Sequence, residues 1–420
     1  MLSAVYSWLS RYFSLVVLAS ILAIVVARLI PTEQPELRWD SVGYHLWTYA
    51  LIEGDLNFER YRNCYGYIGL YPTRDGAWFH NKYPPGVALI RLPVMAFLVG
   101  DDITTNGISR KEGIAALILG ALALWGTGFF ALRSCRHVCA AGWTPHLAVL
   151  AGFFGTGLFF YCTVDSGYSH VWSALGFSIL VDRYLASCAN PESKPVGVDS
   201  VLITLLLVLI RNSNVLAIVF LSLSFAAWRS RRGMVWKRSL FYAMLGGGMG
   251  LAIHIALNSY AHGRLVFSSY ADEEFLWHRP MHDSVLFSSQ QGLFPYAPLF
   301  GIVLLAGWSI RVTRSATTAY AVLMASYVFV YGYWHCWNLG GGVGHRGFVE
   351  ISPLLIPLFA GCLAYASRPV LQCFLAATIL GIWISQSFAV ACFRGTYPWS
   401  TQSRDTYVEN LIGEHALWRY

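Results

Sequence analysis

Long apolar runs recur along the chain, and they restrict its fold more than any other feature. Runs of about twenty residues return between residues 12 and 390, and a helix of that length crosses ~30 Å of hydrocarbon. Apolar residues make up 56% of the 420 residues and charged residues only 12%, whereas soluble domains carry roughly a quarter charged residues. The sequence therefore predicts one all-α, polytopic membrane domain over residues 1–420, with about 10–12 transmembrane helices.

The runs also predict where the helices lie. The first span covers residues 12–30 and is expected to remain as an uncleaved anchor. Residues 201–228 are too long for one span, so two short helices are expected to meet at Arg211-Asn212-Ser213-Asn214. Residues 87–99 are short and broken by an arginine and a proline, which predicts an interfacial or re-entrant helix. The other predicted spans are residues 113–132, 144–161, 170–185, 241–257, 296–310, 318–333, 351–366 and 370–390.

Basic clusters beside the spans predict the orientation. They are Arg133 and Arg136, the cluster from Arg229 to Arg238, and Arg311 and Arg314. If residues 201–228 form a hairpin, all three clusters face one side, which the positive-inside rule assigns to the cytoplasm. Outer loops are then expected at residues 31–112, 258–295 and 334–350, with a polar outer tail at residues 393–420. The net charge of +7 comes from such clusters and does not indicate nucleic-acid binding.

The nine cysteines show no CxxC pair and no Cys/His spacing typical of a metal site. Most lie inside apolar runs, where cysteine behaves as a small hydrophobic residue. Cys64 and Cys336 fall in predicted outer loops, and whether they form a disulfide stays open.

Four outer stretches contain polar side chains without an evident packing role. They begin at Asp40, Asp165, Ser288 and Trp334. On a helix, Asp40 would share one face with aromatic residues, which suits a sugar or a lipid headgroup. In the fourth stretch, glycines would let backbone N–H groups approach an anion, and Arg346 could bind a phosphate through two parallel hydrogen bonds. Capped helix starts, interfacial aromatic residues and flexible turns would explain the same stretches without any ligand.

The order of these stretches resembles that in bacterial relatives of dolichyl-phosphate-mannose protein mannosyltransferases and aminoarabinose transferases, which have the GT-C glycosyltransferase fold. In such proteins a D-x-x-G-Y-Y-like motif follows the first span, and a K-Y-P-x-G-like motif comes next. The chain has a single acid in the first motif, and His45 takes the place of the second tyrosine. The matching segments are Asp40-Ser41-Val42-Gly43-Tyr44-His45, Lys82-Tyr83-Pro84-Pro85-Gly86, Tyr168-Ser169-His170, Arg211-Asn212-Ser213-Asn214, and the stretches from Ser288 to Pro298 and from Trp337 to Arg346.

The resemblance implies a glycosyltransferase, of hexosyl or pentosyl groups, that takes a sugar from a polyprenyl-phosphate donor. The acceptor would be a lipid, glycan or protein outside the cytoplasm, and the enzyme would lie in a bacterial inner membrane. Asp40 would be the general base, with Asp165 as a second carboxylate that orients the acceptor or is itself the base. Arg346, with Arg211 or Lys82, would stabilise the leaving phosphate.

Other residues of these motifs are expected to bind substrate, and they are Tyr44, His170, Gln290 and His345. No nucleotide-binding motif is present, which agrees with a lipid-linked donor. Nothing in the sequence indicates a divalent cation, so a metal requirement stays open, and no nucleic-acid partner is expected.

Arg211 has a second explanation, because an arginine at membrane depth is costly unless it is paired or meets a ligand. It could serve only as the structural partner of a helix C-terminus. For the chain as a whole, the alternatives are a non-catalytic lipid or glycolipid translocase, an assembly partner without a ligand, and a relative that has lost activity.

Overall fold

A computed structural model describes residues 13, 17, 37, 39–62, 69–99, 108–140, 142–189, 197–231, 237–270, 273–398 and 403–413. The first predicted span, residues 12–30, lies outside these ranges except for two positions, and so does Cys64. Of the pair left open by the sequence, Cys336 is a free thiol.

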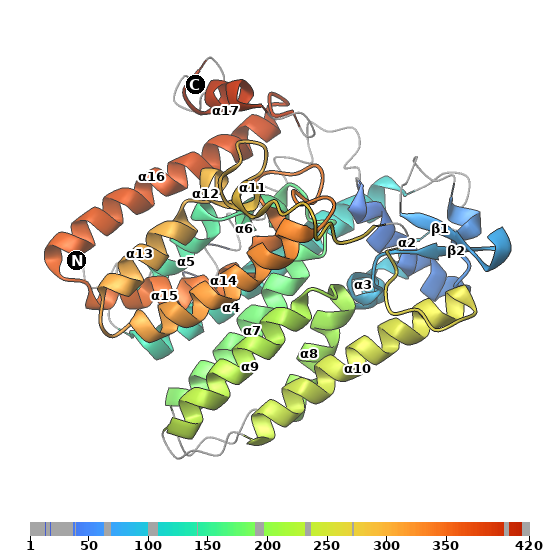
Figure 1. Ribbon diagram of the computed structural model, residues 1–420, viewed down its shortest axis with the longest axis horizontal. Coiled ribbons are helices and arrows are strands. Elements are labelled where there is room, and N and C mark those ends of the chain that lie inside the picture. Colours follow the sequence, from blue (N-terminus) through green and yellow to red (C-terminus); the bar gives the residue numbers. More distant parts are fainter. Residues whose placement is uncertain are drawn as a thin grey trace.

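The described chain is predominantly helical, and its long helices pack side by side in one bundle (Figure 1). A single connected set of buried apolar side chains runs through most of these helices. The helices of the bundle are α4 (Arg110–Val138), α5 (Thr144–Gly155), α6 (Leu158–Thr163), α7 (His170–Ala189), α8 (Val198–Ile210), α9 (Asn214–Arg231), α10 (Lys237–His262), α13 (Leu299–Ser309), α14 (Arg314–Tyr333), α15 (Ser352–Tyr365) and α16 (Arg368–Phe393).

Among the described residues, four helical segments are long and apolar enough to cross a membrane. The segments are Arg110–Val138, Lys237–His262, Arg346–Tyr365 and Arg368–Phe393. Several shorter helices are also apolar, including α5, α8 and α13. The helical class predicted from the sequence is therefore confirmed for the described residues, whereas membrane spanning and the number of spans stay predictions.

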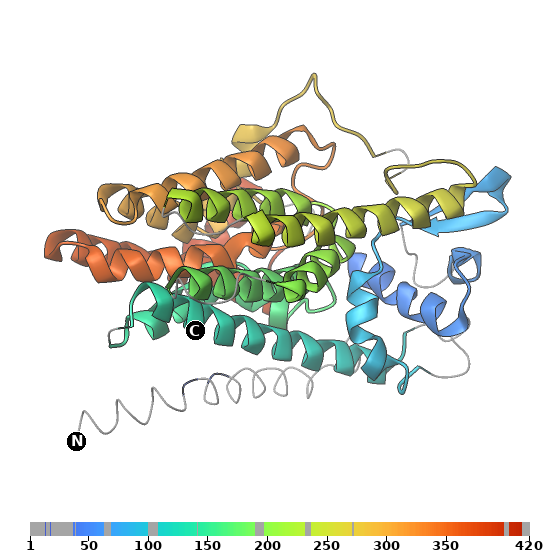
Figure 2. The ribbon, with the colours of Figure 1, turned by 90° about the horizontal axis from the view of Figure 1, so that it is seen from below.

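A small unit at one end of the bundle contains the first outer stretch (Figure 2). Its helices are α2 (Asp40–Glu53), η1 (Phe58–Tyr61), η3 (Arg74–Gly76) and α3 (Gly86–Met95), and its strands are β1 (Leu70–Thr73) and β2 (Trp78–Asn81). The strands pair antiparallel, with Leu70 opposite Asn81. The sequence predicted helices but no strands in this region, and the hairpin is an addition that fits the aromatic residues of both strands.

Helix α2 is held in this unit by its apolar side chains. Val42, Leu46 and Trp47 are buried in a separate cluster with Phe58 and Tyr61 of η1. The indole N–H of Trp47 donates to the carbonyl of Tyr83 at 2.5 Å, which ties α2 to the turn before α3. The start of α2, and with it Asp40, is therefore placed by packing rather than by a cap of its own.

The predicted break at Arg211 is present, because α8 ends at Ile210 and α9 begins at Asn214. The side chain of Asn214 donates to the carbonyl of Leu207 at 2.8 Å and satisfies one of the free carbonyls at the end of α8. Gly86, at the start of α3, lies against the same helix end. A Cβ at Gly86 would lie 2.4 Å from backbone atoms of Leu209 and Ile210, so only glycine allows the two helices to approach this closely.

Two predicted spans are interrupted in the structure. Residues 144–161 contain a break between α5 and α6, where Thr156 is extended at φ −126° and its hydroxyl donates to the carbonyl of Gly152 at 2.7 Å. That local hydrogen bond competes with the helical one. The predicted span 296–310 begins at the last residue of the short helix α12 (Leu293–Tyr296). Its helix α13 starts only after Pro298. The apolar runs predicted both regions as helical but did not reveal the breaks.

The second outer loop and the tail meet at one end of the bundle. After α10 the chain crosses residues 263–281 to α11 (His282–Phe287). In the tail, α17 (Arg404–Ile412) packs on α12, because the hydroxyl of Tyr407 donates to the carbonyl of Pro295 at 2.8 Å. This contact places the tail beside the third outer stretch, and its outward orientation stays a prediction.

The close approach of α3 and α8 at Gly86 can be tested by its effect on stability. Gly86→Ala should force α3 away from α8 and lower the melting temperature of the purified protein by several degrees, because overpacking typically costs ~1–3 kcal/mol. Gly248→Ala is the matched control, since nothing lies within 4 Å of a Cβ at that helical position. An equal melting temperature for the Gly86→Ala variant and the wild type would contradict the close packing described here.

Candidate functional site

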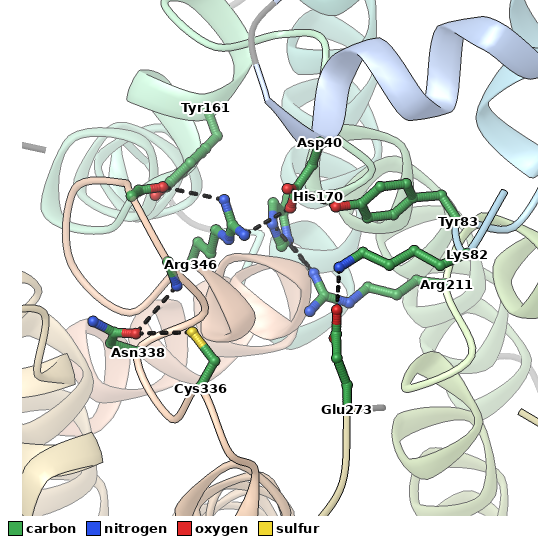
Figure 3. A network of polar contacts seen from close by, with 12 residues as sticks. Asp40, Lys82, Tyr83, Tyr161, His170, Arg211, Glu273, Cys336, Asn338 and Arg346 are labelled. Carbon is green, nitrogen blue, oxygen red and sulfur yellow. Dashed lines mark hydrogen bonds and ion pairs between the residues drawn. The ribbon is translucent and has the colours of Figure 1, made fainter. Parts of the chain in front are cut away.

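An ion pair between Asp40 and Arg346 forms the centre of the site (Figure 3). Nη2 of Arg346 lies 2.7 Å from Oδ2 of Asp40, and the hydroxyl of Tyr83 donates to Oδ1 at 2.7 Å. The side chain of Arg346 is 9% exposed and that of Asp40 is 25% exposed. The structure thus joins the first and fourth outer stretches and leaves Asp40 within reach of solvent.

The glycine-rich loop before Arg346 is held by side chains from three other segments. The hydroxyl of Tyr161 accepts from the N–H of Val343 at 3.1 Å. The carbonyl of Gly342 accepts from Nε2 of Gln291 and from the hydroxyl of Tyr397, both at 3.0 Å. These contacts hold the loop that leads directly into η4 (Arg346–Ile351), the 3-10 helix that Arg346 begins.

Hydrogen bonds within the protein already use some of the backbone N–H groups of the glycine-rich loop. The N–H of Gly340 donates to the side chain of Asn338 at 3.2 Å, and that of Val343 is used by Tyr161. Two of the amide groups expected to approach an anion are therefore engaged within the protein. The guanidinium of Arg346 lies 4.9 Å above the ring of Tyr168 and donates through Nη1 to the carbonyl of Gly341 at 3.2 Å. Arg346, rather than the loop backbone, is the group best suited to an anion.

A second cation, Arg211, lies beside the first. Its Nη1 is 2.9 Å from Oε1 of Glu350, and Nδ1 of His170 is 3.0 Å from the same oxygen. Arg211 comes from the break between α8 and α9, His170 from the start of α7 and Glu350 from η4. A charged hydrogen bond of this kind stabilises an arginine whose side chain is largely removed from water.

A third cation, Lys82, is contributed by the turn before α3. Its ammonium group pairs with Glu273 of the second outer loop, and Glu273 also accepts from the hydroxyl of Tyr71 at 3.0 Å. The hydroxyl of Ser269 donates to the carbonyl of Lys82 at 2.6 Å. Burial raises the pKa of Tyr270, which lies near Lys82, to about 12, so its phenol stays neutral. The second outer loop is thus attached to the site by both side-chain and backbone contacts.

Asp165 and Tyr44 also lie near the central ion pair. Burial raises the pKa of Tyr168 well above its usual value, and the charges of Asp165 and Asp40 both add to this shift. Tyr44 is buried, and its ring centre lies 4.8 Å from that of Tyr83. Tyr44 therefore supports the tyrosine that binds Asp40.

His345 is a buried support rather than a charged group. Its Nε2 lies 2.9 Å from the carbonyl of Trp337, and its ring packs against Tyr331 at 4.9 Å between ring centres. Burial lowers the pKa of His345 to about 3. The imidazole is therefore neutral near pH 7, and it can donate a hydrogen bond but carries no charge for a phosphate.

Gln290 is exposed, and its hydrogen bonds within the described residues run through its backbone, whereas the neighbouring Gln291 is buried and reaches Gly342. Glu350, Glu273 and the contact of Tyr83 with Asp40 were not predicted from the sequence. Glu350 offered a signal, since an acid four residues after Arg346 begins an apolar run. Glu273 offered less, because it stands in an ordinary acidic cluster of an outer loop.

An apolar pocket borders the glycine-rich loop. It is a small cavity, and its lining includes Phe160, Leu293, Phe300, Val343 and Phe348. Residues of one loop therefore border both an apolar cavity and the central ion pair. Among the described side chains, no group of three or more His, Cys, Asp or Glu residues is placed to hold a metal ion.

No protein-family model matches this sequence, and no curated protein matches it. The resemblance to GT-C glycosyltransferases therefore depends on the six sequence motifs. The structure adds that residues from five of these motifs lie in one network of contacts: Asp40, Lys82, His170, Arg211 and Arg346.

The adjacent glutamines provide a test of how the loop is held. Gln291→Leu should remove the hydrogen bond to Gly342 and speed amide hydrogen exchange across residues 339–345, because one buried hydrogen bond contributes ~1 kcal/mol. Gln290→Leu is the matched control and should leave exchange in the loop unchanged. If both variants exchange alike, Gln291 does not hold the loop.

Proposed function

We propose that the chain spans a membrane, with the site on the face away from the cytoplasm. Helices of the bundle present apolar side chains outward, including Leu305, Phe329 and Ile379, which are 70%, 53% and 69% exposed. Such extended apolar surface is rare on soluble proteins and fits contact with lipid.

The direction of α4 supports the proposed orientation. Glu112, near its start, accepts from His45 of α2 at 3.0 Å, and Arg133 lies 21 residues further along. A helix rises 1.5 Å per residue, so about 32 Å separate the site end from this basic cluster. That is about one hydrocarbon thickness, with the basic end facing the cytoplasm.

We infer that the protein is a glycosyltransferase that uses a polyprenyl-phosphate sugar. The observation that carries this proposal is the pairing of Asp40 with Arg346 at 2.7 Å, beside two further cations. A transfer from a lipid phosphate needs a carboxylate near the acceptor hydroxyl and cations near the departing phosphate. The site contains both kinds of group close together.

The proposed reaction is a displacement at the anomeric carbon. The acceptor oxygen forms a bond to that carbon, its proton passes to a carboxylate oxygen of Asp40, and the bond between the carbon and the phosphate oxygen breaks. The bonding electrons leave on the phosphate, which becomes a polyprenyl monophosphate. In this reaction Arg346 stabilises the departing charge, and the hydroxyl of Tyr83 keeps Asp40 oriented.

The donor phosphate competes with Asp40 for the guanidinium of Arg346. A phosphate accepts the same two parallel hydrogen bonds from an arginine as a carboxylate does. Because Asp40 is partly exposed, it can leave Arg346 when the phosphate arrives. Donor binding would therefore release the carboxylate that the reaction needs as a base.

The role of Asp40 is tested by comparing two carboxamide variants. Asp40→Asn keeps the side-chain shape but removes the base, so turnover should fall ~10²–10⁴-fold. Asp165→Asn should reduce turnover less, since it removes only a carboxylate that orients the acceptor. The measurement is release of undecaprenyl phosphate from a panel of undecaprenyl-phosphate sugars by the purified protein.

The alternative roles make different forecasts for this experiment. If Asp165→Asn abolishes turnover and Asp40→Asn does not, Asp165 is the base. If wild type binds the donors but both it and the variants release no phosphate, the chain acts as a lipid-binding or translocating protein and the catalytic proposal fails.

The role of Arg346 is tested by measuring the affinity of the protein for undecaprenyl phosphate, the lipid product. Arg346→Ala should weaken binding of undecaprenyl phosphate and lower turnover ~10²–10³-fold, because a charge-assisted contact to the departing phosphate is lost. Arg346→Lys should recover only part of this, since lysine cannot form two parallel hydrogen bonds. Arg133→Ala removes a cation at the other end of α4 and is the control. Wild-type affinity and turnover in Arg346→Ala would exclude the phosphate role.

A further inference from the structure

Glu350 is a carboxylate without solvent access that lies one short turn after Arg346. Its side chain is 0% exposed, and one of its oxygens, Oε1, meets both Arg211 and His170. The other oxygen, Oε2, has no hydrogen-bond partner within the described part of the chain. One buried oxygen therefore connects the break after α8 with the start of α7.

Glu350 and Arg346 are carried by the same rigid element. Every residue of η4 is buried, from Arg346 to Ile351. The packed ring of Phe348 between them contacts Tyr327, Tyr331 and His345. The spacing between the two side chains is therefore set by a short helix that cannot shift without disturbing the core.

Asp40 and Glu350 differ in their exposure to solvent. Asp40 is 25% exposed and can separate from Arg346, whereas Glu350 is 0% exposed and cannot reach a ligand. All hydrogen bonds of the Arg211 side chain within the described residues pass through Nη1. Nε and Nη2 therefore keep their protons for a ligand, and the Arg211 side chain retains 16% exposure.

We propose that Glu350 is a positioning residue that holds Arg211 through Nη1, so that its remaining N–H groups face the donor phosphate beside Arg346. This inference rests on the proposed function. Glu350 touches neither donor nor acceptor and acts only through Arg211. It also compensates the charge of Arg211 next to the like charge of Arg346, as Asp40 does for Arg346 before the donor binds.

The proposal separates binding from turnover. Glu350→Gln leaves the charge of Arg211 in place but releases its orientation, so affinity for undecaprenyl phosphate should stay within ~3-fold of wild type while turnover falls ~10–100-fold. Arg211→Gln removes the charge itself, so affinity and turnover should both fall. Glu350→Asp keeps the acid at a shorter reach and should recover part of the turnover lost in Glu350→Gln.

A double-mutant cycle tests whether Glu350 acts through Arg211. In the Arg211→Gln background, Glu350→Gln should change turnover by no more than ~2-fold, because the group that it positions is already gone. The double variant should also melt at a higher temperature than Arg211→Gln alone, which leaves a buried acid without its partner.

Asp182→Asn is the matched control for loss of a buried acid. Asp182 is 0% exposed and pairs with Arg133 at 3.3 Å. It lies twelve residues after His170 on α7, about 18 Å further along the helix. This variant should lower the melting temperature without changing affinity or turnover below that temperature.

The outcomes distinguish this inference from the proposed function. Wild type that neither binds undecaprenyl phosphate nor releases it from a sugar donor overturns both. If the wild type binds undecaprenyl phosphate and releases it from a sugar donor, two results would overturn only the positioning role. One is turnover in Glu350→Gln equal to that of the wild type. The other is a loss of turnover on Glu350→Gln that is the same whether or not Arg211 is present. If Glu350→Gln does not fold, the same comparison with Glu350→Asp decides the matter, with a loss of turnover expected only where Arg211 is present.

Discussion

The ion pair between Asp40 and Arg346 is the contact on which the site depends. Its two residues are 306 positions apart in the chain, with Asp40 at the start of α2 and Arg346 at the start of η4. A partly buried ion pair stabilises only when both charges are held in good geometry, because each loses hydration. Packing of α2 places one partner, and the glycine-rich loop with its three supporting side chains places the other.

The cations that surround the central ion pair are all paired with acids. Each of the site's three cations meets one acid: Arg346 meets Asp40, Arg211 meets Glu350 and Lys82 meets Glu273. An anionic ligand therefore has to exchange with a carboxylate rather than enter an already positive pocket. Exposure decides which acid can exchange, and the exposed Asp40 is the one that the proposed reaction needs to release.

The sequence predicted the elements of the site better than their contacts. The break at Arg211 followed from a polar run inside an apolar one, and the candidates Asp40 and Arg346 followed from motif order and chemistry. Their direct pairing did not, because sequence spacing says nothing about which distant segments meet. The β1–β2 hairpin, Glu350 and the hydrogen bond of Gln291 were missed for the same reason, since tertiary packing and not local pattern determines them.

The exchange of Asp40 for a phosphate can be observed most directly in a structure of the protein with undecaprenyl phosphate, determined by electron cryomicroscopy in lipid nanodiscs. We expect phosphate density within hydrogen-bonding distance of Arg346 and Arg211, with Asp40 separated from Arg346 and still bound by Tyr83. Phosphate bound elsewhere, or Asp40 still 2.7 Å from Arg346 while the lipid is bound, would contradict the proposed exchange.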